Sequence, residues 1–106
     1  MKKSRLIRLH VIAKSGQQSG NLTHIGGGVF ESGRWHITPD IAEKAIGAEL
    51  HLHEYQDKTS WFAGIILGWR PADVPDRVFF KLKKNPGLSK SQKEGWGNEQ
   101  SRVWEE

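Results

Sequence analysis

The chain contains no cysteine among its 106 residues, so neither a disulfide nor a thiolate metal site can form. Long hydrophobic runs are missing as well. The apolar stretch from Leu6 to Ala13 is interrupted by Arg8 and His10, and it is too short and too polar for a signal peptide or a membrane span. We therefore expect no contact with a membrane and a cytoplasmic location, which the lack of cysteine fits.

Motifs that name a reaction are also lacking. No serine lies in a Gly-x-Ser-x-Gly elbow, and the triple glycine 26–28 is not followed by the Gly-Lys-Ser/Thr of a phosphate-binding loop. Tyr55 and Ser60 could act as acid or base only in a pocket that tuned them. We expect no catalytic residue and no cofactor, although an enzyme is not ruled out. We interpret residues 26–28 as a bend or flexible loop, because consecutive glycines disfavour regular structure.

Tryptophan and positive charge are what the chain has in excess. Five tryptophans occur in 106 residues, and 16 Lys and Arg stand against 12 Asp and Glu, a formal net charge of +4. So many large rings are more than one small core buries easily, and tryptophan is favoured where a surface is partly apolar and partly wet. Aromatic rings that stack on bases, together with cations that hold phosphates, are typical of nucleic-acid-binding surfaces.

Apolar and polar residues alternate with the two-residue period of strands in several segments. The length fits one domain over 1–106, with 85–106 as an irregular tail that carries a short terminal strand. We predict a β-rich α+β fold, a small curled antiparallel sheet or open pseudo-barrel of five to six strands with one short helix. The expected strands are 5–14, 48–55, 61–70, 77–83 and 102–104, with two short ones at 29–30 and 34–37 on either side of a turn at 32–33.

One helix is predicted over 39–46. Thr38 is a good N-cap, Pro39 suits the first helical position, and Gly47 is placed to end the helix. Segment 61–70 is apolar on both faces, which indicates a central strand. Its glycines, Gly64 and Gly68, would let another backbone approach or let the strand bend.

A histidine pair is the candidate metal site. On a strand, His51 and His53 point to the same face as Glu49, a geometry that zinc sites use when one or two further ligands are supplied. The simpler interpretation, which we prefer, is the polar outer face of a half-exposed strand. We therefore expect no metal.

A family resemblance lies in residues 46–80. A short helix precedes a strand from Gly47 to His53, a polar loop, a glycine-marked strand from Trp61 to Trp69, and a strand from Val78 to Leu82. This order resembles the small β-barrels of the PUA-like superfamily, which includes the EVE, ASCH and YTH domains. The resemblance implies a pseudo-barrel that binds RNA or modified nucleic acid, with a base held beside the barrel against aromatic side chains.

The leading hypothesis is a noncatalytic module that binds nucleic acid, either RNA, a single strand or a modified base. Trp35 and Trp61 would stack on a base, while His36 and His53 would offer ring nitrogens to a base edge. The residues expected to contact phosphates are Arg34, Lys58, Arg70 and Lys81.

Two alternatives stay open. The same tryptophan-rich face would serve a protein-interaction module, such as an inhibitor or adaptor, because Trp and Arg are common hot-spot residues. A small metal-dependent or histidine-based enzyme built on Glu49, His51 and His53 is the third reading. A homodimer would hide surplus aromatic surface at a two-fold interface.

Overall fold

The computed structural model of the protein describes residues 5–12, 22–55, 59–88 and 100–105. These residues form one seven-stranded sheet, a single short α-helix and one 3-10 turn. The elements are β1 (Arg5–Ile12), β2 (Leu22–Gly26), β3 (Val29–Trp35), α1 (Pro39–Lys44), β4 (Glu49–His53), β5 (Phe62–Pro71), β6 (Val78–Lys84), η2 (Pro86–Leu88) and β7 (Gln100–Glu105).

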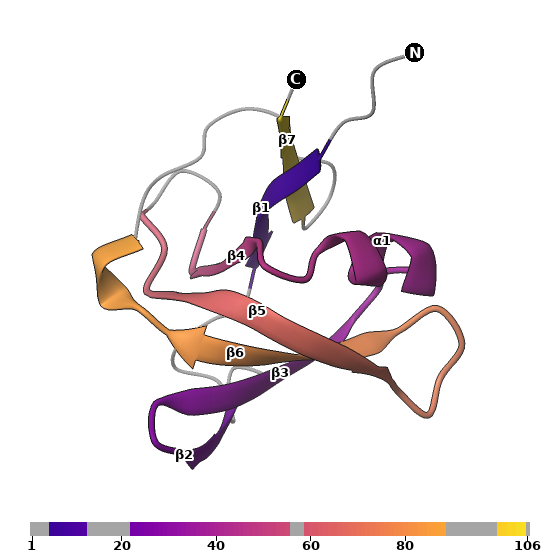
Figure 1. The fold of residues 1–106 in the computed structure, drawn as a ribbon, viewed down its shortest axis with the longest axis horizontal. Helices are drawn as coiled ribbons and strands as arrows, with labels where there is room; N and C mark the ends of the chain where they lie inside the picture. The colour runs from indigo at the N-terminus through magenta and orange to yellow at the C-terminus, as the bar shows by residue number, and fades with distance from the viewer. Residues whose placement is uncertain (1–4, 13–21, 56–58, 89–99, 106) are drawn as a thin grey trace.

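The strand order is β2-β3-β6-β5-β4-β1-β7, with β2 and β7 at the two open edges (Figure 1). Neighbouring strands are antiparallel except β1 and β4, which run parallel with Leu9 opposite Leu50 and Val11 opposite Leu52. The β-rich α+β prediction of an open sheet with one short helix is therefore confirmed. Within the described residues the sheet has more strands than the five or six expected.

The additional strand comes from a hairpin at the triple glycine, where a loop was expected. β2 and β3 are joined at Gly27 and Gly28, whose φ angles of 60° and 80° are left-handed conformations that glycine adopts without a Cβ clash. The turn expected at 32–33 is wrong, because β3 runs unbroken through Ser32 and Gly33.

Alternating side chains from the sheet build the core. Leu50 and Leu52 of β4 are fully buried as expected, and Phe80 and Leu82 of β6 lie in the same cluster. The remaining buried members of this cluster are Leu6, Leu9, Val11, Trp35, Ile37, Ala42, Ala45, Phe62, Ile66 and Val78. Burial of such side chains is the main stabilising contribution, about 1.5–3 kcal/mol for each large one.

Helix α1 covers part of this core through Ala42. It starts at Pro39 as predicted, after Thr38 at the N-cap, although the Thr38 side chain makes no capping hydrogen bond. The helix ends at Lys44, two residues earlier than expected. Gly47 follows at φ 90° and donates its N–H to the Ile66 carbonyl at 2.8 Å, which fixes the end of the helix on β5.

Strand β5 lies between β4 and β6, as expected of a central strand. A Cβ atom on Gly64 would lie 2.7 Å from the Lys83 carbonyl oxygen, so this glycine does permit a close backbone approach. Gly68 instead follows a register shift between Ile66 and Gly68, where β5 bulges against β6. Helices long and apolar enough to cross a membrane do not occur in the described segments.

Candidate nucleic-acid interface

The outer surface of β3, β6 and β5 carries the candidate site. Along β6, Val78, Phe80 and Leu82 point into the core, whereas Phe79 is half-buried and Lys81 is exposed on the opposite side. Lys81 pairs with Glu31 of β3 and Gly68 of β5, and Phe79 pairs with Arg70 of β5. We call the surface formed by Glu31, Arg70, Phe79 and Lys81 the Phe79 face.

Arg70 makes two kinds of contact across this face. Its Nε and Nη2 atoms donate to Glu31 Oε2 and Oε1 at 2.7 and 2.9 Å, a bidentate fork. Its guanidinium carbon also lies 4.1 Å from the centroid of the Phe79 ring, the arrangement of a cation–π contact. Hydrogen bonding to Arg70, with the added charges of Arg70 and Lys81, lowers the pKa of the Glu31 carboxyl, so the group is ionised at neutral pH.

Gly33 of β3 leaves the space that the Phe79 ring fills. A Cβ atom on Gly33 would lie 2.5 Å from Phe79 Cδ1 and 2.9 Å from the Val78 carbonyl oxygen. The ring therefore lies against the backbone of Gly33, where any larger residue would collide with it. Gly33 on one side and Arg70 on the other hold the aromatic ring in a fixed position.

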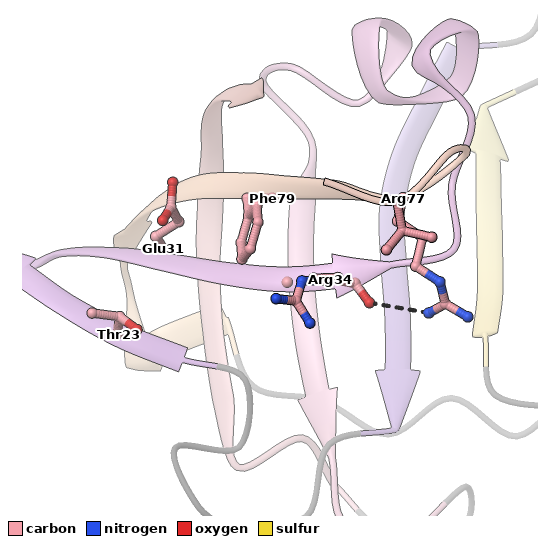
Figure 2. A pocket seen from close by; sticks show the side chains of 7 residues that line it. Thr23, Glu31, Arg34, Arg77 and Phe79 are labelled. Atoms are coloured by element: carbon pink, nitrogen blue, oxygen red, sulfur yellow. Dashed lines mark hydrogen bonds between the residues drawn. The ribbon is translucent and has the colours of Figure 1, made fainter. Parts of the chain in front are cut away.

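Beyond Phe79 opens a hollow of about 490 Å³, lined by Thr23, Glu31, Gly33, Arg34, Val74, Arg77 and Phe79. Figure 2 shows Glu31 and Phe79 toward one end of this hollow and Arg77 toward the other, with Arg34 between them. Arg77 donates to the Arg34 carbonyl at 3.4 Å, and Arg34 Nε lies 3.1 Å from Asp73 Oδ1 in an exposed ion pair. An exposed ion pair of this kind contributes little to stability, so Arg34 can exchange Asp73 for an anionic ligand. Arg77 makes a long hydrogen bond to a neutral carbonyl, which leaves its charge available to an anion.

A second hollow, of about 270 Å³, lies on the β5 side of the same ring. Glu31, Arg70, Phe79 and Lys81 line it together with Leu67, Gly68 and Trp69. Leu67 is 48% exposed, and the indole N–H of Trp69 donates to Glu43 Oε1 of α1 at 2.9 Å. Apolar and cationic groups thus meet on both sides of Phe79.

Three of the residues predicted to contact phosphates, Arg34, Arg70 and Lys81, line these two adjacent hollows. Two other predicted site residues are buried. Trp35 is 6% exposed, with its indole N–H donating to Ser32 Oγ at 2.9 Å, and His53 is completely buried. The base-binding roles expected of Trp35 and His53 therefore do not fit this structure, because a base could reach neither ring.

The remaining predicted residues lie apart from the Phe79 face. Trp61 is partly buried against the core, and His36 is exposed, with its carbonyl accepting a hydrogen bond from Gln100 at 3.0 Å. Lys58 lies outside the described residues. Four tryptophans thus lie in the core or pack against it, namely Trp35, Trp61, Trp69 and Trp104. Trp96 lies outside the described residues. Trp69 at the edge of the smaller hollow is the one that lines part of the site in the described residues.

Sequence reasoning missed Phe79, Arg77 and Glu31. Phe79 alternates with Val78 and Phe80, and this alternation already places it on the polar side of its strand beside Lys81. An aromatic residue on the polar side of an alternating strand was therefore an available signal. Glu31 and Arg77 reach the site only through the pairing of β3 with β6, which the sequence alone does not show.

On the other half of the sheet, three histidines form a buried cluster. His10 of β1 and His51 and His53 of β4 are all 0% exposed. His10 Nδ1 lies 2.7 Å from His53 Nε2, and the rings of His10 and His51 stack with centroids 4.6 Å apart. The expected common face of His51, His53 and Glu49 is present, but the half-exposed strand is wrong because the cluster is buried.

The cluster does not fit the metal site considered for Glu49, His51 and His53. His51 Nε2 and Glu49 Oε1 lie 2.8 Å apart and bond each other, and His53 Nε2 faces His10. In the part of the chain that the structure describes, no three His, Asp or Glu side chains are arranged to hold a metal ion. The His10–His53 bond links β1 to β4, whereas His51 bonds Glu49 of its own strand.

His51 also bonds Ser60 Oγ through Nδ1 at 3.0 Å, which completes a hydroxyl–imidazole–carboxylate chain with Glu49. Such a chain can move a proton away from a hydroxyl. Ser60 is only 4% exposed, however, so a substrate cannot reach its oxygen in this arrangement. The chain instead satisfies polar groups inside the protein.

No family model, curated protein or solved structure matches this chain.

Proposed function

We propose that the protein is a noncatalytic module that binds single-stranded nucleic acid on the Phe79 face. One observation carries the proposal: Arg34, Arg70, Arg77 and Lys81, from three different strands and one loop, surround a single aromatic ring that lies between two hollows. A ring on the open face of a sheet stacks on an unpaired base, while surrounding cations hold the phosphates.

The charges of the Phe79 face suit a strand with a polyanionic backbone. Glu31 and Asp73 partly offset Arg70 and Arg34, and the Arg34–Asp73 pair is exposed on both sides and exchanges readily. Arg77 contacts a neutral carbonyl, and Lys83 on the same strand as Lys81 donates to the Gly27 carbonyl at 2.8 Å. The net positive character of this surface would attract a phosphate backbone.

This proposal differs in detail from the surface expected from the sequence, since Phe79 takes the place of Trp35 as the stacking ring. The likeness of residues 46–80 to PUA-like barrels remains a prediction, as does a cytoplasmic location. A protein partner on the same surface is the competing hypothesis. It predicts binding that depends weakly on salt and is indifferent to nucleic acid.

The test is a titration of fluorescently labelled single- and double-stranded RNA and DNA, followed by anisotropy at about 50 mM and about 200 mM salt. We expect saturable binding that prefers a single strand and weakens at the higher salt. The variant Arg34→Ala/Arg77→Ala should bind much more weakly. Lys44→Ala/Arg102→Ala removes the same charge from exposed positions on α1 and β7 and should bind like the parent. Equal losses in the two variants would contradict the proposed site.

A further inference from the structure

The Arg70 side chain contacts Phe79 and Glu31 in the way that a bound ligand would. Its flat guanidinium lies over the Phe79 ring at 4.1 Å and, in the same position, offers two N–H groups to the two oxygens of Glu31. Stacking and a two-donor fork are thus combined in one planar group. A ligand that replaced it would need the same shape and the same pattern of donors.

Guanine has these properties. Its ring system is planar, and its Watson–Crick edge presents N1–H and the N2 amino group as two neighbouring donors, which match a carboxylate. Adenine and cytosine present an acceptor beside their single amino group, and uracil presents one donor between two acceptors. A carboxylate that accepts two hydrogen bonds therefore selects guanine among the four bases.

We propose that Glu31 and Phe79 form a recognition site for a guanine base, and that Arg70 fills this site in the free protein. The inference rests on the proposed function and deepens it by naming the base. On binding, Arg70 leaves the Glu31 carboxylate, the base stacks on Phe79, and Arg70 becomes available to a phosphate. The exchange replaces one pair of N–H···O bonds with another, so it costs little hydrogen bonding.

Three features of the structure favour this exchange. The side chain of Arg70 is 57% exposed and that of Glu31 23%, so a ligand can reach their ion pair from solvent. The Glu31 carboxylate keeps a positive neighbour in Lys81 when Arg70 leaves. The hollow of about 490 Å³ that Glu31 and Phe79 also line contains Arg34 and Arg77, which are placed to hold the phosphates next to the base.

The experiment compares short uridine-rich RNA strands that carry one central guanine, inosine or adenine. Inosine keeps N1–H but lacks the N2 amino group. Because a good bidentate contact discriminates by about 1–3 kcal/mol, we expect guanine to bind about 5-fold to 150-fold more tightly than adenine, with inosine between them.

Variants identify the residue that gives the preference for guanine. Glu31→Gln keeps the size of the side chain but offers one acceptor and one donor, so guanine and adenine strands should bind about equally. Asp76→Asn is the matched control, because it removes the same charge at an exposed loop position with φ 60°, which asparagine tolerates. Arg70→Ala should bind strands more weakly but retain the guanine preference, since it removes a phosphate contact and the group that fills the site but not the Glu31 oxygens that select the base. Circular dichroism checks that each variant folds.

Free nucleotides distinguish the source of the base: guanosine and adenosine monophosphate are titrated while intrinsic tryptophan fluorescence is followed, with Trp69→Phe to identify the contribution of the ring that lines the smaller hollow. A preference for guanosine monophosphate without strand binding would support the base site and overturn the proposed function. Two results would overturn the guanine site and leave the proposed function standing: equal affinities for RNA strands with guanine, inosine or adenine at the centre, or a Glu31→Gln variant that keeps the guanine preference. No binding of either ligand would overturn both.

Discussion

His10 Nδ1 and His53 Nε2 lie 2.7 Å apart across the sheet, so one proton is shared between two fully buried rings on separate strands. His10 belongs to β1 and His53 to β4, and these neighbours are the parallel strands of the sheet. A hydrogen bond of this kind needs one ring to donate and the other to accept. Of the two facing nitrogens, one therefore carries the proton and the other accepts it.

Replacing one member of this pair should destabilise the protein. His53→Leu removes a partner of His10 inside the protein, and loss of a buried hydrogen bond in this way costs about 1–3 kcal/mol in the free energy of unfolding. The double variant His10→Leu/His53→Leu should cost less than the sum of the two single changes, since neither ring then loses a partner to the other. Urea unfolding of the four proteins measures this coupling, and strict additivity would show that the bond contributes nothing.

Two glycines of β5 should differ in how alanine substitution changes stability. Gly64→Ala places a Cβ 2.7 Å from the Lys83 carbonyl oxygen, a backbone atom that cannot move without disturbing β6, whereas a Cβ on Gly68 meets nothing within 4 Å. We expect Gly64→Ala to lower the free energy of unfolding by about 1–3 kcal/mol and Gly68→Ala to change it little. Thermal unfolding of both variants tests this difference, and similar melting temperatures would contradict the close approach of β5 and β6.

Phe79 should contribute much of the affinity for single-stranded nucleic acid. Phe79→Ala removes the stacking surface and should cost about 1–3 kcal/mol in binding, while Phe79→Tyr keeps an aromatic ring and should cost far less. Because Phe79 is half-buried, unfolding should be measured beside binding. Equal affinities for Phe79→Ala and the parent protein would show that the strand binds elsewhere.

The salt dependence of binding should show which single arginines contact a phosphate. If Arg77 contacts one phosphate, Arg77→Ala should reduce the slope of log K against log salt by about 0.7 for a single strand. Arg102→Ala, an exposed arginine on β7, should leave the slope unchanged. Anisotropy titrations over a range of salt concentrations give both slopes.

Acid should remove the contribution of the Glu31–Arg70 pair to stability. Bonding to Arg70 lowers the pKa of Glu31 in the folded protein below its ordinary value of 4.5, so the unfolded chain binds the proton more tightly. The contribution is therefore present above pH 4.5 and is lost as pH falls through the lower pKa of the folded state. The stability difference between the parent and Glu31→Gln, measured by urea unfolding, should shrink across that range. A difference that stays constant down to the most acidic conditions would contradict the assignment.

Much of the fold follows from local pattern in the sequence. The alternation of Leu50 and Leu52 with His51 and His53 predicts β4 and its core face, because a pleated strand separates its two sets of side chains. Pro39 likewise marks the first residue of α1. These features depend on neighbouring residues in the chain, so a single sequence contains them.

The candidate site depends on pairing between distant strands, whereas the hairpin of β2 and β3 is local and differs from the loop expected at the three glycines. Consecutive glycines disfavour regular structure and so predict a loop at 26–28, but β2 and β3 pair on either side of them, and Gly27 and Gly28 supply the left-handed turn. Glu31 and Arg70 meet across β6, and no local pattern brings them together. The burial of Trp35 is also a property of the assembled core, which a count of tryptophans does not show.

The position of β1 between β4 and β7 has a consequence for folding. The first described strand pairs with the last, so the sheet is not complete until residues 100–105 have left the ribosome. Proteins dominated by such distant pairings fold slowly, since the chain must close long loops before the contacts repay the lost entropy. During synthesis one side of β1 would present unpaired backbone groups to other chains, and an exposed strand edge of this kind favours aggregation. A chaperone that covers that edge should therefore raise the yield of folded protein. A lower expression temperature should act in the same direction, because it slows aggregation.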